Sequence, residues 1–234
     1  MHRVEAGTTS DWQHVPPKDR NIWQNVASQT FGIVTPANFV TVVGIILVID
    51  GLIDFSSGNL LFGLAKIAIG RIMDIYDGYI AEFTKTKSLA GAIFDYTADM
   101  LLLAISLVTL VNLEVLPLSA ALLIAVPKAI NVLSWVGAVM RKTPTYVLGI
   151  SKIATFIIWF GIVMFLFDEV IEGYVSPGFE SLSWFVLLIG VGLAIPASFQ
   201  YARIGLFGHI PKSKPKTKKP KARTKKRKPH KSKS

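Results

Sequence analysis

Six long apolar runs, separated by short polar breaks, dominate the pattern of this sequence. The runs cover roughly residues 36–55, 59–82, 90–112, 116–139, 147–167 and 183–206. Each run has about the 20 residues that a helix needs to cross the hydrocarbon core of a bilayer. The breaks contain turn formers such as Gly58, Pro117 and Pro177. The pattern predicts an all-α, polytopic membrane protein with six transmembrane helices. A soluble all-α fold is the competing interpretation, but the runs offer few polar faces to water.

Two polar segments flank the apolar region and divide the chain into three parts. Residues 1–34 form an N-terminal segment, 35–207 the transmembrane domain and 208–234 a tail. Within the first part, residues 18–34 predict a short interfacial helix, because apolar side chains such as Ile22 and Trp23 can share one side. An ordinary polar lead-in is the alternative. The tail is too rich in Lys, Pro and Ser to bury a core, which predicts disorder.

The formal net charge of +10 is unevenly distributed along the chain. From residue 211 onward the tail holds 13 of the 25 Lys and Arg residues and none of the 15 Asp and Glu residues. The rest of the chain is therefore slightly acidic. Lys and Arg in the N-terminal segment, at 83–89, at 140–146 and in the tail predict a cytoplasmic location for both termini. The tail is then expected to meet anionic lipid headgroups. A solvated tail without a partner is the alternative, and nucleic-acid binding is not favoured because no groove-reading element accompanies the charge.

Four aspartates lie close together in sequence, at the cytoplasmic ends of the second and third runs. Asp74 and Asp77 are three residues apart, and Asp95 and Asp99 are four apart. Both spacings place the pair on one face of a helix. Because a short loop joins the two helices, they are expected to be antiparallel neighbours whose aspartate faces converge.

Carboxylates that converge in a partly dry place repel one another and need cations to stay ionised. Hard oxygen ligands of this kind suit Mg²⁺, Mn²⁺ or Ca²⁺ rather than zinc or copper. The chain has no cysteine, which excludes thiolate metal sites and disulfides. Two alternatives stay open: pairing with a cation such as Arg71, and a proton or cation path through the membrane. Near the opposite ends of the first two runs, Asp50, Asp54 and Lys66 are expected to form an ion pair without a catalytic role.

The residues around these aspartates resemble the CDP-alcohol phosphotransferase family. That family carries the pattern D-x2-D-G-x2-A-R-x8-G-x3-D-x3-D, and this sequence matches seven of its eight fixed positions with every gap correct. The matching residues are Asp74, Asp77, Gly78, Ala81, Gly91, Asp95 and Asp99. The stretch TPANFVT at 35–41 is similar to the Pro-Asn-x-x-Thr opening of the family's first span, with Ala37 inserted. The resemblance covers roughly residues 18–206 and excludes the tail.

The resemblance implies an enzyme of phospholipid biosynthesis that transfers a phosphatidyl group from CDP-diacylglycerol to an alcohol and releases CMP. It also implies Mg²⁺ or Mn²⁺ as cofactor, an active site on the cytoplasmic side, and a homodimer. The metal ligands implied by the motif are Asp74, Asp77, Asp95 and Asp99. Asp99 is in addition the implied catalytic base. The residues implied to line the nucleotide pocket are Gly78, Ala81 and Gly91.

One position departs from the family pattern by a reversal of charge. Glu82 stands where the family has Arg. A glutamate beside a phosphate-binding site adds repulsion toward phosphate, which predicts lower activity or a different donor geometry; a change that the enzyme tolerates is the favoured interpretation. Arg71 and Lys85 are the cations that are close enough in sequence to replace the missing one.

The acceptor alcohol is expected to bind cations in the later spans. The candidate acceptor-binding residues are Lys128, Arg141 and Lys152. The run GISKIATF at 149–156 resembles a stretch of the family's phosphatidylglycerophosphate and cardiolipin synthases, which favours glycerol 3-phosphate as acceptor. Phosphatidylglycerol and inositol phosphate are the alternative acceptors, so the second substrate is a small or a lipid alcohol. An ion-coupled transporter that uses the same aspartates is the alternative outside enzymes.

Overall fold

The computed structural model describes residues 10–140, 149–171 and 178–207, and this part of the chain is all-helical, as predicted. A 3₁₀ turn (Pro17–Asp19) precedes a short helix, and six long helices follow. The helices are α1 (Ile22–Gln29), α2 (Pro36–Ser56), α3 (Leu60–Phe83), α4 (Leu89–Asn112), α5 (Leu118–Met140), α6 (Gly149–Val170) and α7 (Gly178–Gly205). The tail from residue 208, and with it the prediction of disorder there, lies outside the described residues.

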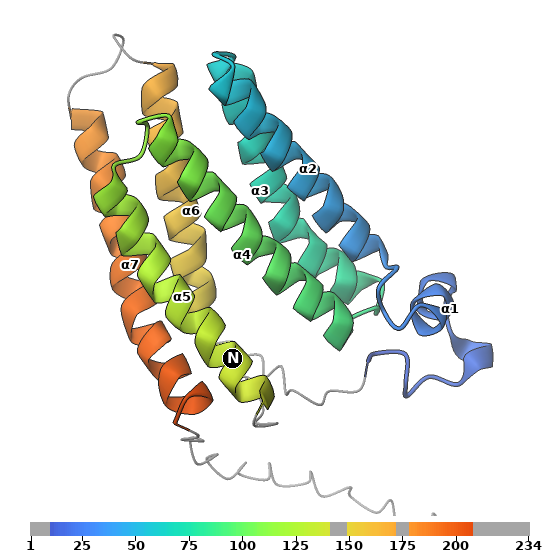
Figure 1. The fold of residues 1–234 in the computed structure, drawn as a ribbon. Coiled ribbons are helices and arrows are strands. Elements are labelled where there is room, and N and C mark those ends of the chain that lie inside the picture. The colour runs from blue at the N-terminus through green and yellow to red at the C-terminus, as the bar shows by residue number, and fades with distance from the viewer. Residues whose placement is uncertain (1–9, 141–148, 172–177, 208–234) are drawn as a thin grey trace, which may run out of the picture.

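The six long helices run alternately in opposite directions and form two groups of three (Figure 1). Helices α2, α3 and α4 form one group, and α5, α6 and α7 form the other. The groups meet where α3 contacts α6 and where α4 contacts α5. This alternation brings the end of α3, the start of α4, the end of α5 and the start of α6 to the same end of the bundle. The aspartates and Lys152 therefore lie toward the same end of the bundle, and Lys128 lies near the middle of α5.

Five of the described helices are long and apolar enough to cross a membrane, judged by length and composition: α2, α4, α5, α6 and α7. The protein is therefore a multi-pass membrane protein. Helix α3 has sufficient length, but five charged residues interrupt its apolar character: Lys66, Arg71, Asp74, Asp77 and Glu82. Many large apolar side chains on the outer faces are exposed, for example Phe62 at 70% and Phe185 at 62%. Such a surface suits lipid rather than water.

Two helix boundaries differ from the sequence-based expectation, for local reasons. Helix α1 spans only eight residues of the expected 18–34. Asn21 caps its start, and Phe31 and Gly32 have φ angles of 54° and 80°, which stop the helix. The last long helix begins at Gly178 rather than near residue 183, and Glu180 in its first turn interacts favourably with the helix dipole.

Helices α2 and α3 pack closely because glycines face each other across their contact. A Cβ atom on Gly63 would lie 2.7 Å from the backbone oxygen of Gly51, and one on Gly70 would lie 2.6 Å from that of Gly44. Toward the far end of the same pair of helices, Lys66 Nζ binds Asp50 Oδ2 at 2.6 Å and Asp54 Oδ2 at 2.5 Å. This confirms the ion pair expected from the sequence. Close backbone approach and a charge network together fix α3 against α2.

The N-terminal segment, residues 10–33, covers the loop that joins α3 to α4. Asp11 exchanges two hydrogen bonds with the Lys87 backbone: its N–H donates to the Lys87 oxygen at 3.2 Å, and its Oδ2 accepts from the Lys87 N–H at 3.1 Å. The side chains of Asn21 and Gln24 donate to the carbonyl oxygens of Thr84 and Lys85. Ser88 in turn donates to the Gly32 oxygen. The lead-in before α2 therefore fixes the connection between the two aspartate-bearing helices.

Substitution of Gly63 by Ala is expected to destabilise the protein by about 1–3 kcal/mol, because the new methyl group meets backbone atoms that cannot move aside. Thermal unfolding in detergent measures the change. Gly192→Ala in α7 is the matched control, since a Cβ there meets no atom within 4 Å. Equal unfolding temperatures for the two variants would contradict the close α2–α3 contact.

Candidate metal centre

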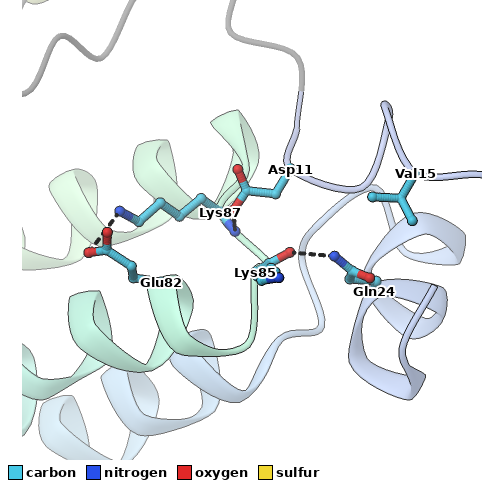
Figure 2. A pocket seen from close by; sticks show the side chains of 6 residues that line it. All are labelled: Asp11, Val15, Gln24, Glu82, Lys85 and Lys87. Atoms are coloured by element: carbon cyan, nitrogen blue, oxygen red, sulfur yellow. Dashed lines mark hydrogen bonds and ion pairs between the residues drawn. The ribbon is translucent and has the colours of Figure 1, made fainter. Parts of the chain in front are cut away.

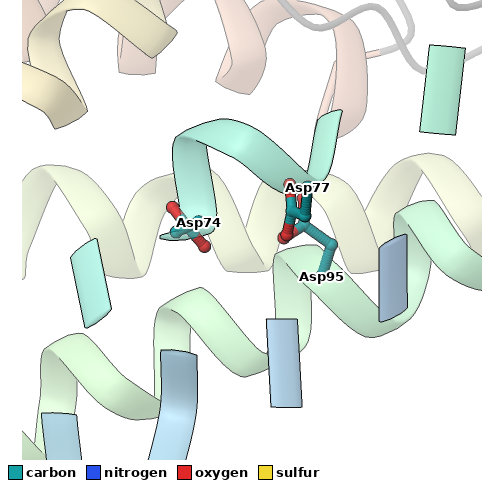
Figure 3. Close-up of side chains that lie close together, drawn as sticks. All are labelled: Asp74, Asp77 and Asp95. Atoms are coloured by element: carbon teal, nitrogen blue, oxygen red, sulfur yellow. The ribbon is translucent and has the colours of Figure 1, made fainter. Parts of the chain in front are cut away.

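Three aspartates from two helices meet near one end of the bundle. Asp74 and Asp77 lie one turn apart on α3, and Asp95 lies on α4 (Figure 3). Each offers a carboxylate oxygen, and these oxygens all lie within 4.8 Å of one another. Asp77 is the most buried of the three, with 7% of its surface exposed. The convergence predicted from the i, i+3 and i, i+4 spacing is therefore confirmed for these three residues.

Asp77 is held in place by a residue of α2. The Thr41 hydroxyl contacts Asp77 Oδ2 at 2.5 Å and the Ala37 carbonyl oxygen at 3.1 Å. A hydroxyl has one proton to donate, and the shorter contact is the one to the carboxylate. Thr41 belongs to the TPANFVT stretch noted in the sequence, but nothing there indicated its partner. This threonine fixes the orientation of one oxygen of the aspartate group.

The fourth aspartate has a different partner. Asp99 Oδ1 lies 2.9 Å from Nη2 of Arg71 and forms an ion pair with it. The geometry of this contact is not that of a hydrogen bond. The same Nη2 donates a hydrogen bond to Asp74 Oδ2 at 2.8 Å. Asp99 is not a member of the group of three that lies within 4.8 Å. Arg71 therefore joins an aspartate of α3 to an aspartate of α4, as the sequence allowed for Asp74.

The Arg71 side chain also contacts the second group of helices. Its guanidinium carbon lies 4.1 Å from the centre of the Trp159 ring on α6. Its Nε and Nη1 atoms and the indole Nε1 of Trp159 are buried without a hydrogen-bond partner among the described residues. Sequence reasoning missed Trp159, because it lies in an apolar run and no spacing relates it to the motif.

The donor set fits a divalent cation. Four carboxylates outnumber the described cations near them, which are Arg71, Lys128 and Lys152, so an excess of negative charge remains in a partly buried place. Carboxylates so close together repel one another. A hard divalent ion prefers carboxylate oxygens and offsets that charge. Asp74, Asp77 and Asp95 are the residues that could hold such an ion, because their oxygens already converge.

The small residues of the motif lie in different surroundings. A Cβ on Gly91 would lie 3.0 Å from Ser88 Oγ and 3.2 Å from Asn38 Oδ1, so a side chain fits poorly there. A Cβ on Gly78 would meet no atom within 4 Å, which leaves open space beside Asp77. Ala81 is partly buried. The space at Gly78 is compatible with the expected nucleotide pocket.

Glu82, the residue that departs from the family pattern, points to a different part of the surface. Its side chain is 65% exposed and its Oε2 lies 3.3 Å from Lys87 Nζ. It lines a cavity of about 310 Å³ between the N-terminal segment and the α3–α4 loop (Figure 2). The other lining residues are Asp11, Val15, Gln24, Lys85 and Lys87. The three clustered aspartates are not part of this cavity.

Of the three residues expected to bind the acceptor alcohol, the structure describes two. Lys128 on α5 is buried, with 6% of its surface exposed, and its Nζ donates to Thr155 Oγ1 at 2.5 Å. It is also close enough to Asp99 and Arg71 to interact with their charges. Lys152 on α6 is exposed but interacts with the charge of Asp95. Arg141 lies outside the described residues.

A sequence model of the CDP-alcohol phosphatidyltransferase family matches residues 34–196, which is more than half of the chain. The chain belongs to the CDP-alcohol phosphatidyltransferase family. Comparison with curated proteins gives no significant match, and comparison with solved structures gives none either. This CDP-alcohol phosphatidyltransferase is therefore a transferase of substituted phosphate groups in phospholipid biosynthesis, whose substrates are a CDP-alcohol and an alcohol acceptor. Enzymes of this family generally use a divalent metal, which agrees with the aspartate group.

Substitution of Thr41 by Val in this phosphatidyltransferase is expected to weaken Mn²⁺ binding about 10- to 100-fold, the usual range when a partner of a metal ligand is lost. Valine keeps the shape of the side chain but removes the hydroxyl that orients Asp77. Electron paramagnetic resonance of free Mn²⁺ in a titration measures the affinity. Thr109→Val, ten residues beyond Asp99 on α4, is the control and should bind Mn²⁺ as the parent does. Unchanged affinity in Thr41→Val would exclude this role.

Proposed function

We propose that the protein catalyses the metal-dependent transfer of a phosphatidyl group from CDP-diacylglycerol to glycerol 3-phosphate, with release of CMP. The observation that carries the proposal is the convergence of three aspartates from α3 and α4 beside a fourth, Asp99. Asp74, Asp77 and Asp95 hold Mg²⁺ or Mn²⁺ in this proposal. The bound ion would offset the negative charge of the diphosphate as the bond between phosphorus and the CMP oxygen breaks.

Asp99 is the catalytic base of the proposed reaction. The acceptor oxygen forms a bond to the phosphorus that carries the diacylglycerol group, and the bond from that phosphorus to the oxygen of CMP breaks. The proton of the acceptor hydroxyl passes to the Asp99 carboxylate. Asp99 suits this task because it lies beside the group of three without belonging to it, so one carboxylate remains to accept a proton.

Buried hydrogen-bond donors near the aspartates support the proposal that the substrates are anionic. Arg71 Nε, Arg71 Nη1 and Trp159 Nε1 have no acceptor among the described residues, and a buried donor without an acceptor is costly. Phosphate oxygens are acceptors of the right kind. The open space at Gly78 accommodates a ligand beside the metal-binding aspartates, and with Ala81 and Gly91 it forms the proposed nucleotide pocket.

Lys128 is the proposed main contact for the acceptor phosphate. Its ammonium carries three protons, and the described contact to Thr155 uses one of them. Lys152 lies in the first turn of α6 and interacts with the charge of Asp95, so it can contribute from the rim. Phosphatidylglycerol and inositol phosphate also carry phosphate and are the acceptors to compare with glycerol 3-phosphate.

The proposed topology includes α3 as a sixth span. Its charged residues Arg71, Asp74 and Asp77 have partners on α2, α4 and α6 rather than an open face, which reduces the cost of placing them in a bilayer. Lys and Arg at the end that carries the active site place that end in the cytoplasm, together with both termini. α1 then lies at the interface, and the basic tail meets anionic lipid. We also propose a homodimer, and membership of the family is the only support for it.

The purified protein with Mn²⁺ or Mg²⁺ is expected to release CMP from CDP-diacylglycerol when glycerol 3-phosphate is added. Asp99→Asn should lower the turnover by about 100-fold or more, because an amide cannot accept the proton. A panel of glycerol 3-phosphate, inositol phosphate and phosphatidylglycerol identifies the acceptor. Absence of CMP release with every acceptor, in protein that unfolds cooperatively, would overturn the proposal, and full activity of Asp99→Asn would remove its role as base.

Lys128→Met is expected to raise the KM for glycerol 3-phosphate about tenfold or more and to leave the KM for CDP-diacylglycerol within about twofold, since a charge-assisted phosphate contact is worth roughly 1.5–3 kcal/mol. Steady-state kinetics with each substrate varied in turn measures both constants. Lys87→Met removes the same charge from an exposed residue at the aspartate end of the bundle and serves as the control. Equal effects on both KM values would contradict an acceptor-specific role for Lys128.

A further inference from the structure

Arg71 is the only described cation in direct ion-pair contact with the aspartates of the motif region, and it is not part of the family pattern. Its Nη2 atom lies 2.8 Å from Asp74 Oδ2 on its own helix and 2.9 Å from Asp99 Oδ1 on α4. Only 11% of its side-chain surface is exposed. At position 82, where the family has its cation, the glutamate pairs with Lys87 in the surface cavity. The cation in direct contact with the aspartates is therefore Arg71 and not the residue at position 82.

The Trp159 ring is the surface against which the Arg71 guanidinium lies. The guanidinium carbon is 4.1 Å from the ring centre, within the range of a favourable cation–π contact. Trp159 is 96% buried, and its indole N–H has no partner among the described residues. A buried tryptophan usually gives that N–H a partner. In the unliganded protein the indole therefore contributes its face to this contact, and its N–H remains available for a substrate oxygen.

These contacts form a chain of three residues on three helices. Trp159 on α6 lies against Arg71 on α3, and Arg71 lies against Asp99 on α4. The two remaining nitrogens of the guanidinium have no protein partner among the described residues, so the carboxylates and the ring alone determine where it lies. Movement of the ring would release the guanidinium, and Asp99 would lose the contact that orients it.

We propose that Trp159 and Arg71 are positioning residues, in which the Trp159 ring holds the Arg71 guanidinium and the guanidinium fixes Asp74 and Asp99 as the internal counter-charge of the aspartate group. The assignment rests on the proposed function for the role of Asp99 as base. The counter-charge itself is a property of the unliganded protein. Arg71 takes the place of the cation that the family carries at position 82.

A double-mutant cycle on kcat tests the chain of contacts. Trp159→Leu is expected to lower kcat about tenfold with the KM for CDP-diacylglycerol within about twofold, and Trp159→Phe should recover most of that loss because a ring remains. In an Arg71→Met background, Trp159→Leu should cause no further loss, since its effect passes through Arg71. Additive losses would show that Trp159 only packs the helices and would overturn the proposal.

Trp184→Leu is the matched control for helix packing. Trp184 on α7 stacks edge-on against Phe165 at 5.6 Å and belongs to the same core. Its loss should lower stability without a selective effect on kcat. Arg71→Lys completes the set: it keeps the charge but loses the planar fork, so its kcat should fall while its Mn²⁺ affinity stays near that of the parent protein.

Mn²⁺ binding without substrate tests the counter-charge independently of catalysis. Arg71→Met removes a positive charge beside the aspartates and is expected to bind Mn²⁺ about tenfold or more tightly, even as kcat falls. A residue that only supports the fold would weaken both properties when removed. Weaker or unchanged Mn²⁺ binding in Arg71→Met would overturn the assignment. Absence of CMP release from the parent protein would instead overturn the proposed function, and the Mn²⁺ result would still decide the role of Arg71.

Discussion

The constraint on which the rest of the structure depends is the need to keep four carboxylates together inside an apolar bundle. Each buried ion costs several kcal/mol in lost hydration unless another charge or dipole replaces the water. The structure provides the Arg71 guanidinium and the Thr41 hydroxyl in direct contact, and the ammonium groups of Lys128 and Lys152 close enough to interact with Asp99 and Asp95. These partners balance only part of the charge. The remaining negative charge is the physical reason why the aspartate group suits a divalent cation.

The position of the aspartates depends on how closely the first two long helices approach. Glycines on both sides of the α2–α3 contact let the backbones nearly touch, and this places Thr41 within reach of Asp77. A wider separation would leave that hydroxyl bonded only to its own helix at Ala37. Packing at the glycines and chemistry at the aspartates are therefore linked through a single hydrogen bond.

The sequence predicted those features that depend on one helix at a time. Apolar runs predicted the long helices, and aspartate spacing predicted the faces on which Asp74, Asp77 and Asp95 meet. The ion pair of Lys66 was also within reach, because it joins neighbouring helices with a short connection. The Trp159–Arg71 contact could not be predicted from the sequence. It joins α3 to α6 across 88 positions of the chain, and only the packing of the two helix groups brings the residues together. The sequence likewise left Glu82 ambiguous, because its direction depends on Lys87 and on the turn that follows α3.

The N-terminal segment shows why the site cannot be understood from the family-matched residues alone. The match begins at residue 34, yet the loop between the two aspartate pairs is held from outside it, by Asp11 and by the side chains of Asn21 and Gln24. Contacts within the loop add to this: the backbone N–H groups of Lys85 and Thr86 donate to the carbonyl oxygens of Glu82 and Ala81, and the hydroxyls of Thr84 and Thr86 bond to each other. The register of Asp95 relative to Asp77 therefore depends on a polar lead-in that precedes the first span. A polar segment before the first span thus helps to determine the geometry of the aspartate group.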